Sequence, residues 1–134
     1  MTKLFFVIFL AVSSAIGMAG EEHRVVRMKV TSYCCCEKCC GDNAIGYTST
    51  GKLAKGTQGV AADPKLLPYG TVLEIPGIGK LPVDDTGGAM RQDAKKGIYH
   101  IDIRAADHET AKKFGVKWLE VKVLPKDSKR AADK

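Results

Sequence analysis

The chain has 134 residues, a formal net charge of +6 and 45% hydrophobic residues. That length indicates one folded domain, and the composition excludes a collagen-like or wholly disordered chain. Aromatic residues make up only 7% of the chain, so few side chains are available to stack on bases. The excess of positive charge is also too small to indicate a nucleic acid, and no nucleic-acid partner is predicted.

Residues 1–19 have the layout of a secretory signal peptide. Lys3 supplies a basic start, residues 4–16 are an apolar run, and Gly17 and Ala19 are small residues before a cut in front of Gly20. A bilayer span needs about 20 apolar residues, so this run is too short, although an uncleaved anchor is the alternative. We therefore expect export to the periplasm, the cell envelope or the medium, with no stable membrane span.

The last nine residues, 126–134, are mostly charged and lack apolar periodicity, which predicts a disordered tail. Residues 20–125 then form a single domain, which we expect to be a monomer. Its first element is a half-buried strand in which Val26, Met28 and Val30 alternate with basic or polar residues. Gly and Pro interrupt the middle of the domain and favour short strands. Strands are predicted over residues 24–33, 59–62, 71–75, 80–84, 98–104 and 117–124.

One short helix is predicted near the C-terminal end of the domain. Asp107 is a suitable N-cap, Ala111 and Phe114 supply the apolar face, and Gly115 suits the C′ position. A mainly β chain with regularly spaced short strands and one short helix favours a small closed barrel.

Three aspartates lie within predicted strands or at their ends. Asp63 precedes Pro64, which cannot donate to a β-ladder, and Asp85 precedes the pair Gly87-Gly88. Asp102 stands between two core-facing isoleucines, so it is expected to face a barrel mouth or the opposite surface. The two glycines would allow positive φ angles and the close approach of a ligand. Simple turn capping by Asp63 and Asp85, and solvent exposure of Asp102, are equally good readings of the local sequence.

Several motifs in order resemble the 3D domain, a family named for its three aspartates. They are Val60-Ala61-Ala62-Asp63-Pro64, Leu67-Pro68-Tyr69-Gly70-Thr71, Asp85-Thr86-Gly87-Gly88-Ala89-Met90 and Ile101-Asp102-Ile103. The resemblance covers most of residues 26–124. It implies an all-β fold, a six-stranded double-psi β-barrel, similar to the C-terminal barrel of membrane-bound lytic transglycosylase A and more distantly to expansins and rare lipoprotein A.

The resemblance implies cleavage of glycosyl bonds in peptidoglycan glycan strands, by a lytic or a hydrolytic route, during cell-wall turnover. Asp85 would be the catalytic acid and base, with Asp63 and Asp102 as the other two catalytic aspartates. A lytic transglycosylase needs one carboxyl group that protonates the glycosidic oxygen and then takes the proton of the sugar's own 6-hydroxyl. We expect neighbouring carboxylates to raise the pKa of Asp85. Strand alternation should send Asp84 to the opposite face.

Candidate substrate-binding residues surround these acids: Thr86, Gly87, Gly88, His100 and Tyr69. His100 is equally well read as an exposed strand residue, and His108 is expected to be an exposed residue in the first turn of the helix. Trp118 is expected to pack rather than to bind sugar. A stand-alone barrel also fits an expansin-like protein that binds or loosens the wall without turnover.

All five cysteines lie between residues 34 and 40. They could form disulfides, which would leave one thiol over, or a thiolate metal site. The run resembles the Cys-x-Cys-x-x-Cys-Cys-Gly motif of related stand-alone barrels, which implies that Cys34, Cys36, Cys39 and Cys40 are the participating residues and Cys35 an extra thiol. A redox role for the pair Cys36 and Cys39 is a third reading. Glycan cleavage requires no cofactor, and the only cofactor considered is a soft metal ion at this cluster, Zn²⁺ or Cu⁺, with zinc as the main candidate.

Overall fold

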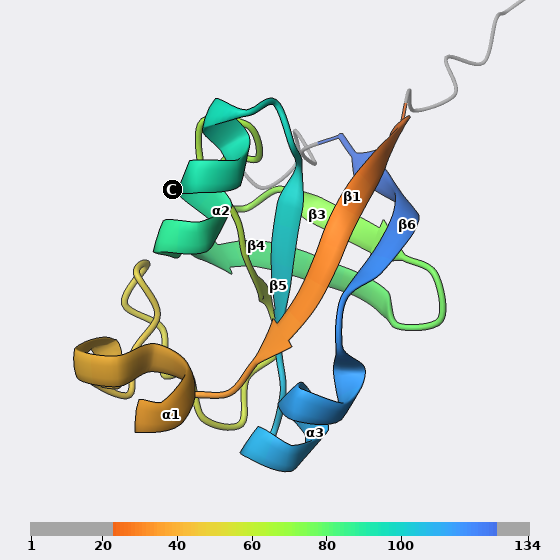
Figure 1. Cartoon of the computed structure of the whole chain (residues 1–134). Helices are drawn as coiled ribbons and strands as arrows, with labels where there is room; N and C mark the ends of the chain where they lie inside the picture. Colours follow the sequence, from red (N-terminus) through yellow and green to blue (C-terminus); the bar gives the residue numbers. More distant parts are fainter. Residues whose placement is uncertain (1–22, 126–134) are drawn as a thin grey trace, which may run out of the picture.

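A computed structural model describes residues 23–125 (Figure 1). The predicted signal peptide, residues 1–19, and the predicted tail, residues 126–134, lie outside the described residues. Within residues 23–125, no helix is long and apolar enough to cross a membrane.

Six strands close into a barrel in the order β1-β5-β2-β4-β3-β6, with β6 pairing back to β1. The pairs β1·β5 and β2·β4 are parallel, and the other neighbours are antiparallel. This arrangement confirms the predicted mainly β fold with a six-stranded barrel (Figure 1). The strands are β1 (Arg24–Tyr33), β2 (Val60–Ala61), β3 (Val72–Ile75), β4 (Gly79–Asp85), β5 (His100–Arg104) and β6 (Lys117–Leu124).

The barrel interior is filled by the alternate apolar residues of these strands. Met28 and Val30 of β1 are fully buried, as their alternation with polar neighbours predicts. Strand β5 differs, because its polar face is covered as well as its apolar face. The buried core comprises Met28, Val30, Val60, Ala62, Leu67, Leu73, Ile75, Leu81, Val83, Ile101, Ile103 and Val121.

The structure contains more helix than the single element predicted. Helix α3 (His108–Phe114) is the predicted one, and the Asp107 side chain accepts a hydrogen bond from the Thr110 N–H at its start. The additional elements are α1 (Glu37–Cys40), the 3₁₀ turn η1 (Gly41–Asn43) and α2 (Gly88–Lys95). The prediction of one helix was therefore wrong.

Helix α2 was missed because its first residues were interpreted as a glycine turn. Neither Gly87 nor Gly88 has a positive φ angle. Gly87 is extended and forms the N-cap, and Gly88 begins the helix. Met90 then inserts into the protein with 5% of its surface exposed, so packing of this side chain compensates for the poor helix propensity of the glycine.

A buried ion pair joins β4 to β5 across the short strand β2. The guanidinium of Arg104 donates two hydrogen bonds to the Asp84 carboxylate, at 3.0 and 2.8 Å. Their side chains are only 1% and 2% exposed. The carboxylate lies against Gly59, where any Cβ would collide with its oxygens. Glycine is therefore required at position 59 by packing.

Replacing Arg104 by Met should destabilise the fold by about 3–5 kcal/mol, because it leaves the Asp84 carboxylate buried without its cation. Urea unfolding monitored by circular dichroism would measure the loss. The matched control is Lys52→Met, since Lys52 also faces Asp84, at 3.6 Å, but is half exposed and should contribute less than about 1 kcal/mol. Equal losses in the two variants would contradict this role of Arg104.

Candidate functional site

A pocket of about 420 Å³ opens at the end of the barrel where β2 and β4 end. Its volume is in the range typical of small-molecule sites. The segment 43–49 and α1 form one wall, and the start of α2 forms another. The residues proposed from sequence that line it are Asp85, Asp102, Thr86, Gly87, Gly88, Cys39 and Cys40.

Asp85 and Asp102 flank the floor of this pocket. Ala61 of β2 is paired with Asp102 of β5 on one side and with Asp85 of β4 on the other. Ala61 and Asp102 are a direct pair and point to the same face. The register of β2 against β4 shifts between Val60 and Ala61, and Asp85 lines the same pocket on the other side of Ala61. Two strand spacings separate the Cα atoms of Asp85 and Asp102 by about 10 Å. The small side chain of Ala61, which also lines the pocket, leaves the space between them open.

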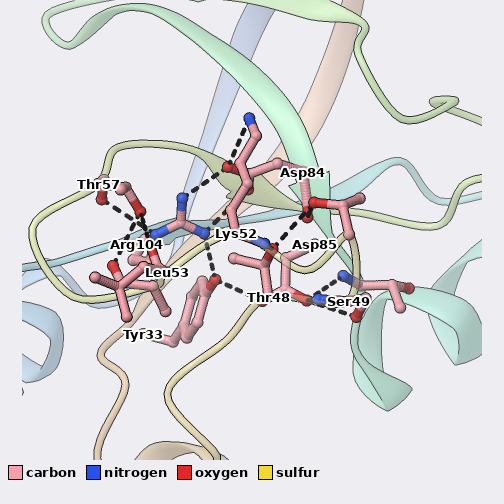
Figure 2. A network of polar contacts seen from close by, with 12 residues as sticks. Tyr33, Thr48, Ser49, Lys52, Leu53, Thr57, Asp84, Asp85 and Arg104 are labelled. Atoms are coloured by element: carbon pink, nitrogen blue, oxygen red, sulfur yellow. Dashed lines mark hydrogen bonds and ion pairs between the residues drawn. The ribbon is translucent and has the colours of Figure 1, made fainter.

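Asp85 is held by four hydrogen bonds (Figure 2). Its Oδ1 accepts from the Ser49 N–H and hydroxyl, at 2.9 and 2.7 Å, and from the Thr86 N–H at 2.8 Å. Its Oδ2 accepts from the Tyr33 hydroxyl at 2.8 Å. Burial raises the pKa of Asp85, but these donors outweigh burial and hold the pKa below its ordinary value.

The expectation that nearby carboxylates raise the pKa of Asp85 is therefore wrong. The reason is that the sequence did not reveal its donors, which come from β1 and from the segment before β2. The prediction for Asp84 is confirmed. Its side chain points away from the pocket to Arg104, whereas Asp85 faces the pocket.

One donor of Asp85, the Tyr33 hydroxyl, is itself held by the buried ion pair. Arg104 Nη1 donates to the Tyr33 hydroxyl at 3.1 Å, so one cation contacts Asp84 directly and reaches Asp85 through Tyr33 (Figure 2). Burial raises the pKa of Tyr33, which therefore stays protonated and donates to Asp85. The Thr50 hydroxyl donates to the Asp84 carbonyl at 2.7 Å. This contact ties the segment that carries Ser49 to the end of β4.

Asp102 has a different environment from Asp85. Its one hydrogen bond among the described side chains is with the Thr31 hydroxyl, at 3.0 Å. Burial raises the pKa of Asp102 to about 6, and the charge of Asp85 adds to this rise. Asp102 is therefore about half protonated at pH 6 and about one-tenth protonated at pH 7, while Asp85 is ionised throughout this range.

His100 lies behind Asp102 and not in the pocket. Its side chain is buried, with Nε2 2.8 Å from the Thr31 hydroxyl, so the reading of His100 as an exposed strand residue is wrong. The other ring nitrogen, Nδ1, lies 2.9 Å from the Asp93 carboxylate of α2, in a geometry short of a well-directed hydrogen bond. Burial lowers the pKa of His100, which favours the neutral ring. Its contact with Asp102 therefore passes through Thr31.

Two other residues proposed from sequence lie away from the pocket. Asp63 does not line it, and its Oδ1 accepts the Lys65 N–H at 2.7 Å in a turn. Tyr69 is 37% exposed and does not line it either. Thr86 lines the pocket and holds Asp85 through its backbone N–H, while its hydroxyl faces Arg91. The structure thus brings together two of the three aspartates.

Exposed apolar side chains border the pocket at positions that the sequence analysis did not select. Tyr47 is 57% exposed and Ile45 is 71% exposed, and both line the pocket. Their segment has little regular structure, so no strand or helix periodicity marks these residues. An exposed aromatic ring beside carboxyl groups is a suitable surface for the apolar face of a sugar.

The cysteine cluster forms a second group of chemically reactive side chains. The sulfur atoms of Cys34, Cys36 and Cys39 and the Nδ1 atom of His108 lie within 4.8 Å of one another, so this group could hold a metal ion. The expectation that His108 is simply exposed is therefore wrong. Cys40 is not in the group, and its sulfur contacts the Cys34 carbonyl instead.

The raised pKa of Asp102 predicts a specific effect of pH on stability. In the unfolded chain Asp102 titrates near 4, and in the folded protein it titrates near 6, so the folded state binds more protons in this window. The contribution of Asp102 to stability therefore falls as pH rises from about 4 to 6. Asp102→Asn should be more stable than the wild type at pH 7, and the gap should close by about pH 4 in urea unfolding. A gap independent of pH would refute this environment for Asp102.

Comparison with known proteins shows a partial similarity to a curated protein. No protein-family model matches the chain. An 82-residue match is 34% identical to the cell wall-binding protein YocH of Bacillus subtilis strain 168. The match covers 59% of this chain and 26% of that protein, so the chain spans about a quarter of its relative's length. Over part of its length, the barrel is similar to a protein named for binding the cell wall.

Proposed function

We propose that this protein acts in the bacterial cell envelope and cleaves glycosyl bonds of peptidoglycan at the pocket between Asp85 and Asp102. One observation carries the proposal: two carboxyl groups share a pocket, and their environments push their pKa values apart. Such a pair is typical of sites that use one acid and one carboxylate on a glycosidic bond. The similarity to a cell wall-binding protein supports the choice of a wall polymer as the substrate.

In the proposed reaction, Asp102 is the group that carries the proton. Protonated Asp102 donates its proton to the glycosidic oxygen, and the bond from that oxygen to the anomeric carbon breaks. In the lytic route, the 6-hydroxyl of the same sugar attacks the anomeric carbon, and its proton returns to the Asp102 carboxylate. No water is consumed, and the product ends in a 1,6-anhydro sugar.

The side chains behind Asp102 support both of its protonation states. When Asp102 is ionised, the Thr31 hydroxyl donates to it across the 3.0 Å contact. When Asp102 is protonated, it donates to Thr31, whose own proton then points to Nε2 of His100 at 2.8 Å. Thr31 thus reverses its donor and acceptor roles as the proton leaves, and His100 is a positioning residue.

Asp85 stays ionised and acts on the other side of the bond. A fixed carboxylate stabilises the positive charge that develops at the anomeric carbon. Its four donors keep it charged and immobile, so this stabilisation requires little reorganisation. In a hydrolytic route the same carboxylate would activate a water, and the product would have a reducing end.

The second candidate is a wall-binding protein without turnover. The relative is named for binding the cell wall, which favours this candidate directly. Tyr47 and Ile45 would supply an exposed apolar surface at the pocket. Both candidates predict binding to peptidoglycan, and only the first predicts products that depend on the two aspartates.

Incubation with purified sacculi separates the candidates. The wild type should release soluble fragments, detected by mass spectrometry, and Asp85→Asn and Asp102→Asn should each lower the rate by about 10²–10⁴-fold, as expected for loss of a catalytic carboxyl group. Glu74→Gln is the matched control, because Glu74 is a partly exposed carboxylate on β3 that does not line the pocket. It should cleave at the wild-type rate.

Product ends decide the route: 1,6-anhydro ends indicate the lytic reaction and reducing ends indicate hydrolysis. If no fragments form while the protein sediments with sacculi, the enzyme proposal fails and the binding proposal replaces it. If cleavage persists in both Asn variants, the pocket is not the active site.

The two pKa values also predict the pH profile of cleavage. The rate should be highest between the pKa of Asp85, below its ordinary value, and the pKa of Asp102, about 6. Above pH 6 the rate should fall about tenfold per pH unit, because the fraction of protonated Asp102 falls by that factor. Initial rates on soluble glycan fragments across pH 4–8 test this. A rate that rises through pH 6–8 would exclude Asp102 as the acid.

A further inference from the structure

The end of β1 and the start of α3 bring three thiols and an imidazole to one point. Cys34 Sγ lies 2.8 Å from Cys36 Sγ and 3.0 Å from Cys39 Sγ. His108 Nδ1 lies 3.4 Å from Cys39 Sγ, 3.5 Å from Cys36 Sγ and 3.8 Å from Cys34 Sγ. All four potential ligand atoms are within 4.8 Å of one another. His108 therefore approaches each of the three sulfurs, and not one thiol alone.

Local structure explains why the cysteines converge. The Cys36 carbonyl accepts hydrogen bonds from the Cys39 and Cys40 N–H groups, at 3.1 and 2.9 Å, which closes a tight turn. Such a turn brings the two thiols of a Cys-x-x-Cys sequence together, as in thiolate zinc knuckles. Cys34 is buried at the end of β1 beneath this turn.

His108 reaches the cluster from a distant part of the sequence. Strand β5 runs parallel to β1, and α3 packs against β1. The Ala105 N–H donates to the Tyr33 carbonyl at 2.7 Å, which fixes the chain just before α3 next to the residue that precedes Cys34. Asp107 caps α3, so the position of His108, its first residue, is set by the helix start.

We propose that Cys34, Cys36, Cys39 and His108 bind one Zn²⁺ ion as a structural site. Three thiolates and one imidazole are a tetrahedral zinc ligand set, and four protein ligands leave no open position for substrate. With Zn–S bonds of about 2.3 Å, tetrahedral sulfurs lie about 3.8 Å apart, so the sulfurs need to separate by about 1 Å on binding. The short turn and the single helix start can accommodate this adjustment.

This ligand set differs from two simpler interpretations of the cysteines, a metal site made of four cysteines and a disulfide. Cys40, the fourth cysteine considered from sequence, directs its sulfur to the Cys34 carbonyl at 3.2 Å and lines the pocket. Cys35 also lines the pocket. A disulfide would use two of the converging sulfurs and would give His108 no bonding role. Only the metal site uses all four converging atoms.

The ion would connect the proposed active site to the barrel. The chain that leaves the cluster runs through η1 to residues 43–49, which form a wall of the pocket and end at Ser49, a donor to Asp85. Zinc would tie the start of this wall to α3, while Thr50 and Asp84 tie its far end to β4. We therefore expect the ion to order the wall without taking part in the reaction.

Metal analysis of the purified wild-type protein tests the site. Inductively coupled plasma mass spectrometry should find about one Zn²⁺ per chain after dialysis against metal-free buffer. Cys39→Ser and His108→Ala should each retain about 0.1 equivalents or less, since each removes a ligand. Cys35→Ser and Cys40→Ser are the matched controls, and both should retain about one equivalent.

A second measurement uses the wild-type protein, so its result does not depend on whether the variants fold. The metal-free wild type is titrated with Co²⁺, which gives strong visible absorption in tetrahedral thiolate sites and weak absorption in octahedral ones. Saturation at one equivalent with strong bands, and a higher Tm in the loaded protein, are expected. His108→Cys keeps a tetrahedral ligand set and should restore the binding that His108→Ala loses.

Three results would overturn the proposal. One is a wild-type protein without zinc whose mass, measured without reductant, is lower by two hydrogens per disulfide. Another is loss of zinc from Cys40→Ser with retention by His108→Ala, which would assign a four-cysteine site. The third is a Co²⁺ spectrum typical of octahedral coordination. Because each readout is metal content, absorption or mass, the site is tested independently of glycan cleavage.

Discussion

The buried pair of Arg104 and Asp84 is the interaction on which the site depends. Strand β2 has two residues, so few ladder hydrogen bonds join β4 to β5 through it. The Arg104 side chain spans this gap and donates to Asp84 on β4. The close approach is possible because residue 59 carries no side chain. The pair therefore holds together the two strands that present Asp85 and Asp102.

The same cation also sets the chemistry of the pocket. Arg104 donates to the Tyr33 hydroxyl, which in turn donates to Asp85. Strand alternation divides the adjacent acids between two tasks, because Asp84 faces the buried cation and Asp85 faces the pocket. Structural and functional carboxylates thus occupy consecutive positions of one strand.

The difference between Asp85 and Asp102 comes from burial and hydrogen bonding together. Both are partly buried, and burial raises the pKa of each. Asp85 accepts four hydrogen bonds that reverse this effect, whereas Asp102 has one, from Thr31. An ionised carboxylate and a carboxyl group that keeps its proton up to about pH 6 then face a shared space, with Ala61 between them. This asymmetry is what makes glycosyl transfer chemically reasonable in the pocket.

The sequence predicted the structural features that depend on local pattern, namely strand bounds, a helix cap and the orientation of adjacent side chains. Residues 24–33 and 117–124 were assigned to strands with the observed bounds, and the start of α3 at Asp107 was assigned from its capping residue. The opposite orientations of Asp84 and Asp85 also follow from strand alternation alone. The closed six-stranded barrel came from the resemblance, since periodicity indicated only a small barrel.

What the sequence could not provide depends on contacts between distant residues. Ser49 lies 36 residues from Asp85, and His108 lies 69 residues from Cys39. No spacing rule links either pair, so the Ser49 donor of Asp85 and the histidine of the proposed metal site were both missed. Asp63 was grouped with the other aspartates by resemblance, and the fold instead places its carboxylate in a turn.

The most direct test of the account is a carboxyl ¹³C NMR titration of the wild-type protein labelled at aspartate, with resonances assigned from Asp85→Asn and Asp102→Asn. The account predicts that Asp102 titrates near pH 6 and that Asp85 titrates below the ordinary range of an aspartate. This order would assign the proton to Asp102 before any substrate is added. A titration in which Asp85 holds its proton to higher pH than Asp102 would contradict the account, and would return the role of acid to Asp85.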